Sequence, residues 1–136
     1  MPFQVLSHTA DTGIEATSDT LPGLLAALAT GMFEFMEPVP PGTPGEPVTV
    51  EVESASLEDL VVDLLSELLF VSESEDAMLT RFEVELPSPT NARVTATAVP
   101  IDRSGMVGAP IKAVTYHDLT IEERDGGWYG RVYFDV

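Results

Sequence analysis

The order of the predicted elements indicates an α+β fold in which two helices pack on mixed or largely antiparallel β-sheets. Two segments carry apolar residues at the three- and four-residue spacing of a helix, and most others alternate with the two-residue period of strands. The chain has 136 residues, of which 44% are hydrophobic and 21% charged, so it is long and apolar enough to bury a core. We therefore expect residues 1–136 to form a single domain.

The first part of the chain predicts two short strands and a helix. The strands are expected at 3–6 and 13–17, around a polar connection at 7–12. Thr20 is placed to cap a helix that extends to Met36, and packing must supply most of the stability of this helix because it contains two glycines.

The middle of the chain predicts a strand, a second helix and two further strands. A loop with five prolines at 37–47 leads to an alternating strand at 48–53. Ser56 then caps a helix with a broad apolar stripe, and an acidic exit loop is expected at 72–76. The remaining segments are strands at 81–86 and 92–99, followed by a flexible connection at 100–110.

The end of the chain predicts a β-hairpin, because segments rich in β-branched and aromatic residues flank a glycine turn. Pairing Arg124 with Gly127, across a two- or four-residue turn, gives the hairpin one apolar face, and a one-residue slip would mix its two faces. The expected partners are Ile121 with Gly130, Leu119 with Val132, His117 with Phe134 and Tyr116 with Asp135.

This hairpin holds Lys112, the only lysine of the chain. In the predicted register Lys112 and Asp135 share the polar face but lie about 13 Å apart along the strands. His117 falls on the apolar face, where the expected role is that of a core histidine.

The formal net charge of -17 bounds the choice of partners. Direct nucleic-acid binding is not expected, because phosphates require clustered Lys and Arg. A basic partner or a metal ion fits better, although the acidity can also serve solubility alone. There is no cysteine, and neither a signal-peptide pattern nor a membrane-spanning apolar run is present, so we expect a cytoplasmic protein without membrane association.

The connection at 7–12 contains His8 and Asp11, two residues with metal-binding or acid–base chemistry. Loops between strands are frequent functional positions. A short polar loop can equally use its Asp and Thr side chains to satisfy its own backbone. The local pattern leaves both interpretations open.

Six blocks in order along nearly the whole chain resemble the archease family. They are 8–15 (HTADTGIE), 31–36 (GMFEFM), 57–60 (LEDL) with 67–69 (ELL), 111–117 (IKAVTYH), 126–128 (GGW) and the closing 135–136 (DV). Archeases often have Asp at the position of Ser7, so this resemblance implies no metal-binding role for Ser7.

The resemblance implies a non-catalytic protein cofactor that activates the tRNA-splicing RNA ligase, promoting its guanylylation and multiple turnover. It implies a metal site formed by Asp11, Asp135 and Val136, and a role for Lys112 in activation of the partner; His8 and His117 are possible supporting residues. Oxygen ligands suit a hard cation, so calcium is expected and magnesium is the alternative. Zinc would ordinarily recruit histidine.

Two other functions are compatible with these residues. One is a chaperone-like modulator of an RNA-modifying enzyme. The other is a metal-dependent hydrolase, in which Asp11 and Asp135 hold the ion while His8 or Lys112 acts as a base or stabilises charge. The chain has no glycine-rich phosphate loop and no recognisable Ser–His–Asp context, so we do not expect an enzyme.

Overall fold

The computed structural model describes residues 3–7, 12–101 and 111–136. Within these residues the chain forms eight strands and two helices, and every described strand pairing is antiparallel. The α+β class with two helices is therefore confirmed. In chain order the elements are β1 (Phe3–Ser7), β2 (Thr12–Ser18), α1 (Leu21–Met36), β3 (Glu46–Glu53), α2 (Leu57–Glu75), β4 (Ala77–Ser88), β5 (Asn91–Pro100), β6 (Ala113–Val114), β7 (Thr120–Arg124) and β8 (Gly127–Asp135).

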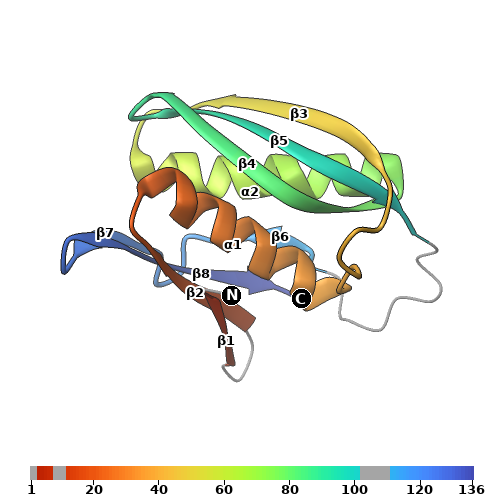
Figure 1. Ribbon diagram of the computed structural model, residues 1–136. Helices are drawn as coiled ribbons and strands as arrows, with labels where there is room; N and C mark the ends of the chain where they lie inside the picture. The colour runs from red at the N-terminus through yellow and green to blue at the C-terminus, as the bar shows by residue number, and fades with distance from the viewer. Residues whose placement is uncertain (1–2, 8–11, 102–110) are drawn as a thin grey trace.

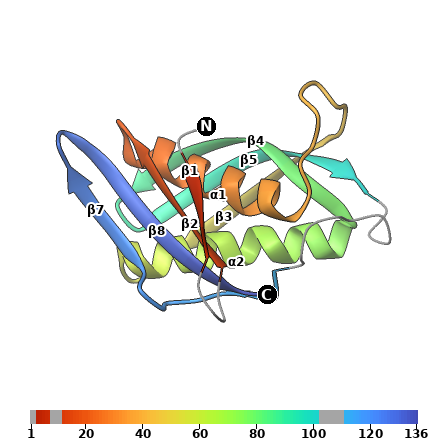
Figure 2. The same cartoon turned by 90° about the horizontal axis from the view of Figure 1, so that it is seen from below.

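The described strands form two sheets, and both helices lie between them (Figure 1). The larger sheet has the order β1-β2-β8-β6, and β7 pairs with another part of β8. The smaller sheet has the order β3-β5-β4. Seen from below, β2 and β8 run obliquely across the helices (Figure 2). This arrangement buries the apolar sides of the helices against both sheets.

Helix α1 begins where the sequence predicts, because the Thr20 side chain accepts a hydrogen bond from the Gly23 amide at 3.1 Å. The helix packs closely on β8 at Gly130. A Cβ atom at this position would lie 2.9 Å from Cδ1 of Ile121 and 3.2 Å from methyl groups of Leu24 and Leu28. A larger residue at 130 would therefore push α1 away from the sheet.

Helix α2 extends one turn beyond its predicted end. Ser56 caps it by accepting a hydrogen bond from the Asp59 amide at 3.1 Å, as predicted. The expected exit loop at 72–76 is wrong, because the helix continues to Glu75 and Asp76 closes it in the left-handed conformation with φ 49°. Ser72 follows Leu68 by four residues, so it extends the buried stripe, and its hydroxyl donates to the Ala77 carbonyl.

The three-stranded sheet accommodates its prolines at edges and ends. Pro47 lies in β3 and Pro87 in β4, the two edge strands, while Pro100 is the last residue of the central strand β5. Strand β4 starts at Ala77, four residues before the predicted strand. In the part of the chain that the structure describes, neither helix has the length and apolar character to cross a membrane.

Candidate functional site

The candidate site is built on a backbone contact between residues 111–117, here called the lysine segment, and the end of β8. The Lys112 amide donates a hydrogen bond of 2.7 Å to the Asp135 carbonyl, and β6 continues this pairing through Ala113 opposite Asp135 and Val114 opposite Phe134. The side chains of Lys112, Asp135 and Val136 are all exposed. One end of the sheet therefore brings the backbone of Lys112 beside that of Asp135, and both side chains are exposed there.

This proximity corrects the predicted hairpin register. The register is right near the turn, where Arg124 pairs with Gly127 and Ile121 with Gly130. It is wrong further along. Val114 pairs with Phe134 and Thr120 pairs with Arg131, so the chain advances six residues on one side while β8 spans only three on the other. Three extra residues are therefore accommodated between β6 and β7. His117 and Tyr116 consequently do not pair with Phe134 and Asp135, and the predicted separation of Lys112 from Asp135 along the strands disappears.

A turn at 116–119 absorbs the extra residues. The Leu119 amide donates to the Tyr116 carbonyl at 3.2 Å, and Asp118 adopts a left-handed φ of 47°. Arg131 holds the turn from β8, because its Nε donates to the Asp118 carbonyl at 3.1 Å. The amide and hydroxyl of Thr115 both donate to the Tyr133 carbonyl at 3.0 Å. These contacts set the position at which the lysine segment rejoins β8.

The turn also changes the environment of His117. The side chain is 59% exposed, so the prediction of a core histidine is wrong. Its Nε2 lies 3.3 Å from a carboxylate oxygen of Asp118, and its ring packs edge-on against Tyr133 with centroids 5.7 Å apart. His117 is thus a surface residue of the turn rather than part of the apolar face.

Strand β2 brings a third segment to the same end of the sheet. Thr12 pairs with Phe134 on one side and with Ser7 on the other. The predicted site residues His8 and Asp11 lie outside the described residues, and Asp11 directly precedes Thr12 in the sequence. The pairing therefore positions the residue after Asp11 beside the residue before Asp135.

The oxygen donors at this end of the sheet fit a hard divalent cation. Asp135 provides an exposed carboxylate, and Val136 beside it, which the prediction names as a second ligand, is also exposed. Hard cations prefer such oxygen ligands. Among the described residues alone, no three His, Cys, Asp or Glu side chains cluster closely enough to hold a metal. A complete site formed by Asp135 and Val136 needs a further ligand, and the prediction assigns Asp11 to this role.

A side-chain hydrogen bond ties the lysine segment to helix α2. The Tyr116 hydroxyl donates to a carboxylate oxygen of Asp59 at 2.7 Å. This hydrogen bond raises the pKa of Tyr116 to about 12, and the negative charges of Asp59 and Asp63 contribute to the increase. Tyr116 therefore remains protonated at neutral pH and can keep donating to Asp59.

We expect Asp59→Asn to lower the pKa of Tyr116 toward its ordinary value of about 10. The raised pKa in the folded state means that the stabilising effect of the contact is complete below about pH 10 and is lost as the pH rises toward 12. Phenolate absorbance during alkaline titration measures the shift, with Tyr116→Phe identifying the contribution of this residue. Identical Tyr116 titrations with and without the Asp59 carboxylate would contradict the assignment.

The sequence interpretation did not identify Asp59 as a contact of the lysine segment. It assigned the acidic residues at the start of α2 to favourable interaction with the helix N-terminus. The only further signal was the position of Asp59 within the resemblance block at 57–60. Its partner Tyr116 is 57 residues away in the sequence, so only the tertiary structure joins them.

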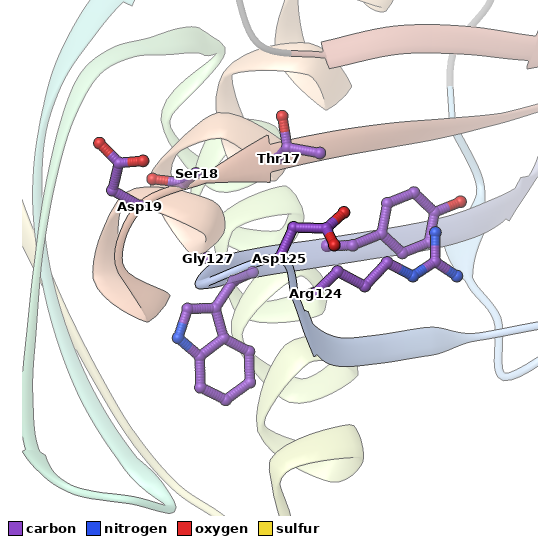
Figure 3. A pocket seen from close by; sticks show the side chains of 8 residues that line it. Thr17, Ser18, Asp19, Arg124, Asp125 and Gly127 are labelled. Carbon is purple, nitrogen blue, oxygen red and sulfur yellow. The ribbon is translucent and has the colours of Figure 1, made fainter.

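A separate pocket of about 630 Å³ lies at the other end of β8. Figure 3 shows Arg124 and Asp125 on the β7–β8 hairpin and Thr17, Ser18 and Asp19 at the end of β2. The Arg124 guanidinium lies 3.9 Å from the centroid of the Tyr129 ring. Burial and the hydrogen bond to Glu15 raise the pKa of the Tyr129 hydroxyl. The pocket is not part of the Asp135 site, because the length of β8 separates them by roughly 23 Å.

Comparisons with known proteins agree with the resemblance in the sequence. Residues 3–136 match the model of the Archease protein family. The protein archease of Methanopyrus kandleri is 31% identical over 140 residues, covering 100% of both chains. The protein archease of Thermococcus gammatolerans is 34% identical over 134 residues, covering 95% of this chain and 94% of the relative.

Solved structures have the same fold. The solution structure of Methanobacterium thermoautotrophicum protein 1598 is 29% identical, covers 99% of each chain and has a TM-score of 0.82. The crystal structure of a Thermotoga maritima archease, described as a possible chaperone, has a TM-score of 0.70 at 22% identity and covers 98% of this chain and 96% of the other. The family match over residues 3–136, together with relatives above 30% identity along the whole chain, shows that this chain belongs to the archease family.

Proposed function

We propose that the protein is a non-catalytic cofactor that activates the tRNA-splicing RNA ligase in the cytoplasm. It promotes guanylylation of the ligase and allows the ligase to act through multiple turnovers, as the family resemblance implies. The supporting observation is the 2.7 Å hydrogen bond between the Lys112 amide and the Asp135 carbonyl. This contact joins two residues that the resemblance assigns to partner activation and metal binding.

The proposed metal ligands are Asp11, Asp135 and the carboxylate of Val136, with calcium as the expected ion and magnesium as the alternative. A cation held by these residues would supply positive charge at this end of the sheet. The chain itself orients the ligands, because the backbone pairing of β8 with β6 and β2 sets the position of Asp135 without using its carboxylate. His8 and His117 are proposed as supporting residues.

Lys112 is proposed to contact the ligase directly. Its side chain is exposed, and its backbone amide provides the pairing with β8. The ammonium group is therefore available as a compact, mobile point charge for an acidic or phosphate oxygen of the partner. The formal net charge of -17 for the whole chain suits a basic region of that partner and disfavours direct contact with RNA.

We expect a tag fused after Val136 to reduce ligase activation much more than the same tag fused before Met1. The C-terminal fusion crowds Asp135 and removes the terminal carboxylate that the proposal assigns to Val136. The measurement is the rate of RNA joining by the ligase in the presence of each tagged form, with melting temperatures as the control for folding. Equal activation by the two forms would show that the chain end is not part of the working surface.

A further inference from the structure

A groove of about 550 Å³ runs between strand β3 and helix α2. The strand contributes Glu51, Val52 and Glu53 to its lining. The helix contributes Asp63, Glu67 and Phe70. The groove thus combines four carboxylates with apolar surface, and it adjoins the edge of the three-stranded sheet.

Phe70 provides an apolar anchor in this groove. It is 62% exposed, whereas the leucines at 64, 65, 68 and 69 of the same helix are buried. Phe70 lies off the helical stripe that packs against the sheets, so the fold does not use this ring for its core. An aromatic ring on a groove wall can bury substantial area against a partner side chain.

Strand β3 provides hydrogen-bonding groups along the groove. Within the described residues it pairs with β5 on one side, and its outer edge has no strand partner. Pro47 lacks an amide hydrogen, which leaves 48–53 as the part of the edge that can pair with another strand. An exposed edge of this kind is a template for an added β-strand.

The charges around the edge select the kind of strand that can pair there. Among the described residues, Arg93 offers a positive charge near these carboxylates. Its Nε lies 3.7 Å from a carboxylate oxygen of Glu51, and both side chains are exposed. A second copy of this chain would bring the same carboxylates to this acidic edge, and like charges repel between paired strands. A strand rich in lysine or arginine would instead find opposite charges on both the sheet edge and the helix.

We propose that this groove binds an extended, lysine- or arginine-rich segment of another protein as an additional strand on β3, with one apolar side chain against Phe70. Backbone hydrogen bonds to 48–53 provide affinity, while Glu51, Glu53, Asp63 and Glu67 select for basic residues. The surface does not require the RNA ligase to be the partner, so it stands independently of the proposed activation.

The test uses the full chain and a synthetic peptide of alternating lysine and valine. The peptide has 8 residues, the length of β3. Binding is measured by calorimetry for the wild type and two groove variants, Phe70→Ala and the double variant Glu51→Gln/Glu53→Gln. The matched control is Glu83→Gln/Glu85→Gln, which removes the same charge from exposed positions of β4, the opposite edge of the same sheet. A second peptide carries N-methyl groups on alternate amides and keeps the lysines.

We expect each groove variant to weaken peptide binding by about tenfold, while the β4 control leaves it unchanged. N-methylation of the amides that face β3 should weaken binding to a similar extent. Equal loss in the groove and β4 variants, or equal affinity for the two peptides, would overturn the proposal and indicate general attraction to an acidic surface. No detectable binding of the first peptide to the wild type would overturn it as well.

Discussion

Asp135→Asn is expected to lower the affinity for calcium by at least about 100-fold, since loss of an outer partner of a metal ligand alone costs about 10- to 100-fold. The substitution preserves the shape of the side chain but replaces a charged oxygen pair by an amide. Hard cations depend on that charge. The fold should be preserved, because the carboxylate is exposed and residue 135 pairs with β6 through its backbone. Calcium titration by calorimetry measures the loss.

Asp125→Asn is the matched control for this experiment. Asp125 occupies the turn at the other end of β8, and asparagine tolerates its left-handed φ of 50°. This variant removes the same charge from the same hairpin and should bind calcium like the wild type. Asp11→Asn should behave like Asp135→Asn. Wild-type calcium affinity in both Asp11→Asn and Asp135→Asn would exclude the assigned site.

Lys112→Ala is expected to reduce activation of the RNA ligase by more than about tenfold while the fold and calcium binding are retained. The backbone amide that pairs with Asp135 remains in alanine, and the lost side chain is exposed. Lys112→Arg should recover part of the activity, because arginine keeps the charge but presents a broad planar group instead of a point charge. Ligase assays at saturating calcium separate this effect from any change in metal binding.

Arg124→Ala provides a comparison with the loss of a positive charge elsewhere on the hairpin. Arg124 lies next to the β7–β8 turn, where it interacts with Glu122 and Tyr129, far from Asp135 along β8. Its removal should leave ligase activation intact. Full activation by Lys112→Ala, with an unchanged melting temperature, would mean that Lys112 is simply a solvated lysine that protects a sheet edge.

The parts of the fold that depend on local signals could be predicted from the sequence. Both helix starts follow from a capping side chain, Thr20 or Ser56, just before an apolar stripe. The pairing of Arg124 with Gly127 follows from the glycine turn. The end of α2 could not be located in the same way, because Ser72 is polar but faces the core and is satisfied by the Ala77 carbonyl.

The geometry of the candidate site was less predictable. The turn at 116–119 contains no glycine or proline, and alternation of polar and apolar residues continues through it, so a continuous strand was the natural interpretation. Asp118 adopts the left-handed conformation there, and Arg131 and Thr115 fix the turn through contacts with backbone carbonyls. The proximity of Lys112 to Asp135 depends on these tertiary contacts, which no local pattern encodes.

Covalent guanylylation of the RNA ligase is the measurement that tests the central proposal most directly. Purified ligase is incubated with labelled GTP, divalent metal and RNA substrate, with or without this protein, and the labelled ligase and joined RNA are followed over successive turnovers. The proposal predicts faster guanylylation and continued joining with the wild-type protein, and neither effect with Lys112→Ala. Identical guanylylation and joining with and without the wild-type protein would contradict it.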